Sequence, residues 1–147
     1  MNQRYFIGTH YRSLDSKGRL VLPQEYRDHL TEEPSFWLTG FYGHLTAYLP
    51  NDWENIIEQF NKVSFRYVKL SNFKSKVIGL AQLITFDPQG RIRIPQPLLR
   101  EAGLTRDCVL LGMYGKFEIW DQSRFEALST DVDITDELDA SQIELNL

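Results

Sequence analysis

The chain has 147 residues, of which 42% are hydrophobic and 24% are charged, so it can bury a core as one domain or as two small fused units. No run approaches the roughly 18 consecutive apolar residues of a membrane-spanning helix, and the N-terminus lacks the basic and apolar regions of a secretion signal, so we expect a soluble cytoplasmic protein. The net charge of −4 argues against a uniformly basic surface, and the single cysteine, Cys108, excludes an internal disulfide and a multi-cysteine metal site.

The first half of the chain predicts short strands, a short helix and a hairpin. β-prone runs at residues 6–14 and 19–22 flank a turn, and Pro23 can lie in the first turn of a helix at residues 25–30. A hairpin follows at residues 36–49, with its turn at Tyr42 and Gly43.

Two helices are predicted between the halves. Asn51 or Asp52 can cap a helix that contains Trp53, Ile56, Ile57 and Phe60 at helical spacing. A second helical segment at about residues 65–76 leads into the second half.

The second half predicts strands at residues 80–86 and 91–94 and a hairpin at 108–121. The alternation of Ile92 and Ile94 with Arg91 and Arg93 indicates a half-buried strand with a basic outer face. The acidic end of the chain either forms a short helix or frays.

The charges are unevenly distributed. Residues 131–147 contain six acidic residues and no lysine or arginine, whereas residues 62–106 contain nine basic and two acidic residues. An acidic tail on a locally basic body occurs in nucleic-acid-binding proteins, although a solvated helix face gives the same pattern.

The two halves repeat at an offset of 72 residues without a gap. Five residues of the segment 14–24 recur in 86–96, and the same offset superposes residues 40–43 on 112–115 and Glu54 on Glu126. Nine identities in register over about 45 positions predict a tandem duplication. We expect an α+β, mainly β fold with repeat units at 5–54 and 80–128, a helical connector at 55–79 and an acidic tail at 129–147.

Each half carries an Asp-x-x-Gly-Arg loop, here called loop 1 (residues 15–19) and loop 2 (residues 87–91). The aspartate carboxylate can accept a backbone N–H in a type I turn, and the glycine supplies the left-handed conformation that closes a bulged hairpin. Turn formation alone explains those two residues but not the arginine that follows them. An arginine at a hairpin tip can bind a phosphate, or the O6 and N7 atoms of guanine, through two hydrogen bonds.

The strings DSKGRLVLPQEYR (15–27) and FDPQGRIRIPQPLLREAGL (86–104) resemble the two signatures of the MraZ family, within the AbrB-like swapped-hairpin superfamily. The resemblance covers about residues 5–126. It implies a tandem-duplicated swapped-hairpin β-barrel with short helices, assembled into a ring-shaped homo-oligomer. It also implies a repressor of the division and cell-wall gene cluster, associated with the nucleoid, that binds repeated promoter boxes in double-stranded DNA without a cofactor or a small-molecule substrate.

The resemblance assigns DNA binding to residues of both loops: Asp15, Ser16, Lys17, Gly18, Arg19, Asp87, Gln89, Gly90 and Arg91. Two features depart from the family pattern. The register places Leu99 opposite Arg27, and the segment before the second half has Lys69, Lys74 and Lys76 where the family often has arginines.

Other function classes fit less well. Paired aspartates from two repeats resemble the site of aspartic proteases, but the arginine in each loop would keep its carboxylate ionised and prevent proton sharing. His10, His29 and His44 lack metal-ligand spacing, so we expect neither a metal site nor an enzyme. The alternative that stays open is an antitoxin-like DNA-binding module that inhibits a protein partner through residues 131–147.

Overall fold

Two antiparallel sheets form the body of the computed structural model, which describes residues 5–147. The larger sheet has six strands in the order β1-β7-β8-β4-β3-β5. Its strands are β1 (Thr9–Ser13), β3 (Ser35–Phe41), β4 (His44–Tyr48), β5 (Gln82–Thr85), β7 (Asp107–Gly112) and β8 (Lys116–Asp121). The smaller sheet, here called the ribbon, pairs β2 (Arg19–Val21) with β6 (Arg91–Arg93).

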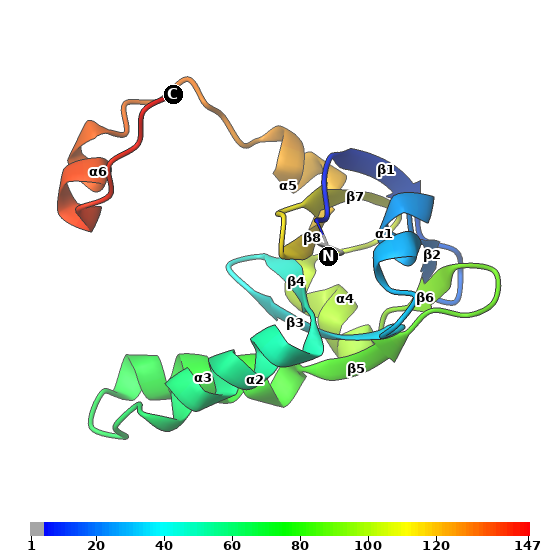
Figure 1. The fold of residues 1–147 in the computed structure, drawn as a ribbon, viewed down its shortest axis with the longest axis horizontal. Helices are drawn as coiled ribbons and strands as arrows, with labels where there is room; N and C mark the ends of the chain where they lie inside the picture. Colours follow the sequence, from blue (N-terminus) through cyan, green and yellow to red (C-terminus); the bar gives the residue numbers. More distant parts are fainter. Residues whose placement is uncertain (1–4) are drawn as a thin grey trace.

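The helices lie outside the sheets. They are α1 (Gln24–His29), α2 (Pro50–Asn61), α3 (Val68–Leu80), α4 (Gln96–Ala102), α5 (Gln122–Glu126) and α6 (Thr135–Ser141). Helices α2 and α3 form an arm that projects from one end of the body, and the ribbon lies at the opposite end (Figure 1). Helix α6 stands away from the body (Figure 1). Within residues 5–147, no helix combines the length and the hydropathy that a membrane crossing requires.

The two halves exchange strands across the six-stranded sheet. Strand β1 of the first half pairs with β7 of the second, and β5 of the second half pairs with β3 of the first. The first strand of each half therefore lies beside the hairpin of the other half, which is β7–β8 or β3–β4. Strands β4 and β8 join the two hairpins at the centre. The mainly β, α+β prediction is therefore confirmed. The sheet is not closed into a barrel, because the edge strands β1 and β5 do not pair with each other and each continues into the ribbon instead.

The ribbon is held to the body by its inward side chains. Leu20 and Ile92, which face each other in the ladder, are 1% and 0% exposed. They join a core that includes Phe6, Tyr26 and Phe117. Full burial of one such aliphatic side chain stabilises a fold by about 1.5–3 kcal/mol. The alternation predicted for the second strand thus orients its arginines outward.

Most predicted elements are confirmed, with shifted boundaries. Helix α3 begins three residues later and ends four residues later than expected. Its last turn is stabilised because Val77 is buried and its carbonyl accepts the Thr39 hydroxyl at 2.6 Å. Pro23 and Pro95 lie at the N-caps of α1 and α4 rather than inside the first turn. The acidic tail does contain a helix, α6, with no buried residue.

Candidate nucleic-acid interface

Loop 1 is a rigid turn organised by one carboxylate. Asp15 Oδ1 accepts the backbone N–H groups of Lys17 and Arg19, each at 2.9 Å, and Oδ2 accepts Arg19 Nε at 2.7 Å. The Gly18 N–H donates to the Asp15 carbonyl at 3.1 Å, and Gly18 has a φ of 75°, which few other residues adopt without strain. The turn chemistry predicted from the sequence is therefore present.

Loop 2 repeats this geometry. Asp87 Oδ1 accepts the N–H groups of Gln89 and Arg91, each at 2.9 Å, and Oδ2 accepts Arg91 Nε at 2.9 Å. Gly90 has a φ of 76°. The two loops therefore have the same backbone turn and the same hydrogen bonds from the aspartate to the arginine.

The aspartate in each loop orients the arginine that follows it. Only Nε of Arg19 and of Arg91 is bound, and among residues 5–147 the terminal nitrogens of both guanidinium groups have no hydrogen-bond partner. Their side chains are 29% and 31% exposed. Each arginine therefore presents two free donor nitrogens in a fixed orientation, which suits two-point binding of a phosphate or a base edge.

The Asp15 carboxyl has a lowered pKa. The pKa falls from 3.8 to about 2. The hydrogen bond from the Arg19 N–H lowers the pKa most, and those from the Arg19 side chain and the Lys17 N–H lower it further, against the opposing effect of desolvation. The same groups lower the pKa of Asp87, with the Arg91 N–H first. Both carboxyls are thus ionised at neutral pH, and neither favours the proton sharing of an aspartic protease pair.

Acidification is expected to leave loop 1 intact until well below the titration range of free aspartate. Because the folded-state pKa of Asp15 lies near 2, its contribution to stability is fully present above 3.8 and is lost as the pH falls toward 2. Carbon-detected NMR of the side-chain carboxyl should give a midpoint near 2, with Asp15→Asn used to assign the resonance. A midpoint near 4 would contradict the hydrogen bonding described here.

The ribbon places a third arginine beside the loops. In its ladder Arg19 faces Arg93, and Val21 faces Arg91. All four side chains point away from the buried Leu20 and Ile92 pair, because side chains alternate along a strand. Arg93 is exposed and has no ion pair within the part of the chain that the structure describes. The outer face of the ribbon is therefore a row of three arginines next to one valine.

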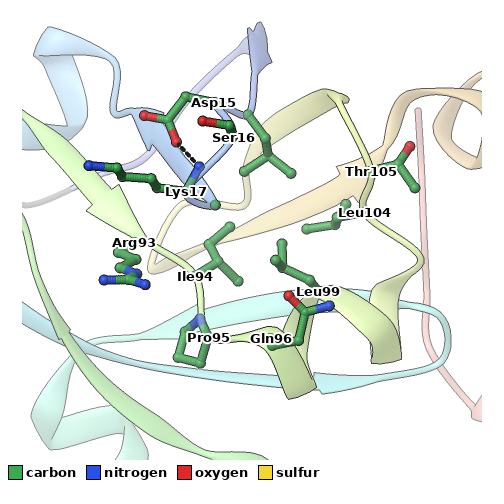
Figure 2. Close-up of a pocket in the computed structure, with 12 residues that line it drawn as sticks. Asp15, Ser16, Lys17, Arg93, Ile94, Pro95, Gln96, Leu99, Leu104 and Thr105 are labelled. Atoms are coloured by element: carbon green, nitrogen blue, oxygen red, sulfur yellow. Dashed lines mark hydrogen bonds between the residues drawn. The ribbon is translucent and has the colours of Figure 1, made fainter.

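A cavity of about 460 Å³ opens beside loop 1. Leu99 and Leu104 line its apolar side, and Lys17 and Arg93 lie on the other side, as Figure 2 shows. The Lys17 side chain has no hydrogen bond or ion pair to any described residue, so its charge is available to a ligand.

The basic segment seen in the sequence divides between two distant surfaces. Lys69, Lys74 and Lys76 lie on α3 in the arm, whereas Arg91 and Arg93 lie on the ribbon. The arm and the ribbon are at opposite ends of the molecule (Figure 1). Helix α3 is therefore separate from the ribbon, although Lys76, toward its C-terminal end, reaches the body, where its Nζ lies 3.7 Å from Glu101 Oε2 on α4.

Each of the three histidines has a local partner of its own. His10 Nε2 lies 3.1 Å from the Ile7 carbonyl, and the His29 ring contacts Phe6 edge-on. His44 stacks on Trp120, with ring centroids 4.4 Å apart, and its Nε2 lies 3.5 Å from Glu118 Oε2. Among residues 5–147, no cluster of three or more His, Cys, Asp or Glu side chains could hold a metal ion.

Sequence reasoning did not include Arg93 or Arg27 among the candidate site residues. The outward position of Arg93 was visible in the strand alternation, but its position opposite Arg19 depends on which strands pair. Arg27, on α1, lies against Gly90 of loop 2. Nothing in the local sequence places a residue of the first half beneath a loop of the second.

Comparison with known proteins agrees with the loop motifs. The model of the family described as "MraZ protein, putative antitoxin-like" matches residues 5–74 and 77–143. A protein named transcriptional regulator MraZ from Nitratidesulfovibrio vulgaris strain Hildenborough is 44% identical over 144 residues, which span 95% of this chain and 97% of that protein. Proteins of the same name from strain Miyazaki F and from Pediococcus pentosaceus are 42% and 36% identical, over 97% and 82% of this chain and 99% and 84% of their own lengths. The chain therefore belongs to the MraZ family.

Proposed function

We propose that this chain is a sequence-specific transcriptional regulator that binds double-stranded DNA through loops 1 and 2 and the ribbon between them. The observation that carries the proposal is the outer face of the ribbon, where Arg19, Arg91 and Arg93 lie together. The loop aspartates fix two of these arginines without using their terminal nitrogens. A two-stranded ribbon fits the DNA major groove, and outward arginines can bind guanine or phosphate there.

The loops and the ribbon have complementary roles in this proposal. In each loop the backbone N–H groups around the glycine are already bound to the loop aspartate, so contacts to phosphates are made by side chains such as Lys17. Arg19 and Arg93 face each other across the ribbon, whereas Val21 replaces an arginine beside Arg91. The two ends of the binding face therefore differ, and Val21 is positioned to contact an apolar group such as a thymine methyl. This difference favours recognition of a DNA sequence that is not palindromic.

The proposed biological role is repression of the division and cell-wall gene cluster through repeated promoter boxes, which places the protein on the nucleoid. Membership of the MraZ family supports this role. DNase footprinting of DNA from upstream of the protein's own gene should show protected boxes at a regular spacing. Uniform protection at all positions, or none at 50–200 mM salt, would contradict sequence-specific binding.

We expect a closed homo-oligomer. The two halves present similar but non-identical edges, so head-to-tail contacts between neighbouring chains can propagate and close into a ring. Light scattering at micromolar concentration should then give a mass that is a whole-number multiple, greater than one, of the 17.2 kDa chain mass. A monomer under these conditions would refute the ring.

The acidic tail is proposed to reduce nonspecific binding. Residues 131–147 pack against no core cluster, and α6 has no buried residue. Their six acids repel DNA or compete with phosphate for the arginines. Deletion of residues 131–147 should therefore tighten binding to random-sequence DNA, most strongly at low salt where screening is weakest. The same affinity for the full and shortened chains at both low and high salt would exclude this role.

A second candidate function uses the tail to bind a protein, as in the antitoxin-like description of the family. Apolar side chains of the tail are exposed, including Val132, Ile134 and Ile143. A peptide spanning residues 129–147, immobilised and mixed with lysate, would capture a specific partner if the tail acts this way. In the same experiment with the immobilised full chain, Arg19→Ala should keep the partner and deletion of residues 131–147 should lose it, which separates the two functions.

A further inference from the structure

The two loops rest on different side chains. Beneath loop 1, Leu99 Cδ1 lies 3.4 Å from the position that a Cβ on Gly18 would occupy. Beneath loop 2, the equivalent position is filled by Arg27, whose Cζ and Cδ lie 2.6 and 2.7 Å from the corresponding point on Gly90. The Arg27 side chain therefore lies directly against the Gly90 backbone, and Gly90 is buried where Gly18 is partly exposed.

The Arg27 charge has no partner within residues 5–147. Its Nε is shielded from solvent and makes no hydrogen bond, and no carboxylate forms an ion pair with its guanidinium group. The carboxylate of loop 2, Asp87, is already bound to Arg91. An unpaired and partly buried cation is unfavourable, and an anion beside it removes that cost.

The repeat shows a matching difference in the loops themselves. At the offset of 72 residues, Lys17 of loop 1 corresponds to Gln89 of loop 2. Loop 1 therefore has a cation of its own in addition to Arg19, and loop 2 has none in addition to Arg91. Arg27 supplies the missing charge from helix α1 of the other half.

We propose that Arg27, which packs against the Gly90 backbone, is a phosphate-binding residue beneath loop 2 that takes a phosphate of the DNA backbone, the counterpart of Lys17 at loop 1. Each loop then has two cations: Lys17 and Arg19 at loop 1, both from its own motif, and Arg91 with Arg27 of helix α1 at loop 2. This proposal rests on the proposed function, because its ligand is the DNA that loops 1 and 2 bind.

The salt dependence of binding distinguishes a phosphate contact from a structural role. Each phosphate contact contributes about 0.9 to the slope of log K against log salt concentration. Arg27→Leu introduces the residue that the fold already accepts at position 99, and Arg27→Gln removes the charge while keeping a longer polar side chain. Arg66→Gln is the matched control, since it removes one charge from the turn between α2 and α3, at the far end of the arm (Figure 1).

The experiment titrates the full chain and its variants against a fluorescent duplex from upstream of the protein's own gene between 50 and 200 mM salt. We expect both Arg27 variants to bind several-fold more weakly, with a slope reduced by about 0.9 for each chain that engages DNA, and Arg66→Gln to match the wild type. Weaker binding with an unchanged slope in both Arg27 variants would show that Arg27 only positions the loop, and unchanged binding would show no role; either result overturns the proposal.

The two proposals can fail separately. If the wild type binds DNA and the Arg27 variants bind equally well, only the phosphate site is wrong. If the wild type binds no DNA, the proposed function is wrong and the phosphate site falls with it. Circular dichroism and thermal unfolding of each variant identify a folding defect, and the two Arg27 substitutions differ enough that one folded variant suffices for the test.

Discussion

Replacement of Arg19 with alanine is expected to abolish specific binding to the promoter boxes while leaving the fold intact. The substitution removes the guanidinium group that Asp15 orients, but the Lys17 and Arg19 backbone N–H groups still bind the Asp15 carboxylate, so loop 1 keeps its turn. One lost two-point base contact costs about 1–3 kcal/mol. If several loops of an oligomer engage together, the losses multiply. Fluorescence anisotropy with a labelled promoter duplex measures the effect.

The lysine substitution separates two possible roles of Arg19. Arg19→Lys keeps the charge but loses the planar fork of donors, so near-normal affinity indicates a phosphate contact and a failure equal to that of alanine indicates base reading. Thermal unfolding should show all three proteins folded, whereas Gly18→Val should disturb the loop because its φ is 75°. Normal promoter binding by Arg19→Ala would remove loop 1 from the interface.

Substitution of Gly112 with alanine is expected to destabilise the whole fold. A Cβ at this position would overlap the backbone of Phe6 and Ile7, which crosses directly over the glycine. Phe6 is 1% exposed and packs against Tyr26 and Phe117, so the chain cannot move aside without exposing it. Overpacking costs about 1–3 kcal/mol, and loss of the Phe6 contact adds about 1.5–3 kcal/mol. The melting temperature should fall by roughly 5–15 °C.

Gly40, one repeat earlier, provides the matched control. The two atoms nearest to a Cβ there would be side-chain atoms, Leu45 Cδ2 at 3.0 Å and Glu101 Cγ at 3.1 Å, and the His44 backbone carbonyl would be in ordinary contact at 3.5 Å. Both side chains can rotate slightly, so Gly40→Ala should lower the stability by no more than about 1 kcal/mol. Equal melting temperatures for the two variants would show that the segment at Phe6 contributes little to the fold.

Local chemistry explains which features could be predicted from the sequence. The Asp-x-x-Gly-Arg loops, the hairpin turn at Tyr42 and Gly43, and the inward alternation of Ile92 and Ile94 each depend on a few adjacent residues. The repeat at 72 residues then extended every local inference from one half to the other. The predicted end of helix α3 was wrong by four residues, because the last turn depends on the contact of Val77 with Thr39 on β3, which a local sequence pattern does not indicate.

Pairing between distant segments explains what was missed. The family resemblance implied a swapped-hairpin fold, but no local sequence pattern indicates that β1 pairs with β7 or β2 with β6, because ladder partners are selected by the packing of the whole chain. Without that pairing, Arg93 could not be placed opposite Arg19, nor Arg27 beneath loop 2. The density of lysine and arginine along the chain was misleading for the same reason, since α3 and the ribbon are adjacent in sequence and separate in space.

The exchange of strands between the halves has a consequence for how such a chain can originate and fold. A half-length chain would lack a partner for its first strand, so it could complete its sheet only by association with a second copy, and its stability would depend on concentration. Joining the halves in one polypeptide makes the same assembly unimolecular. The second copy is then always present at a fixed effective concentration. Each half can also carry residues that the other does not share, such as Arg27 in the first half and Leu99 at the equivalent position of the second.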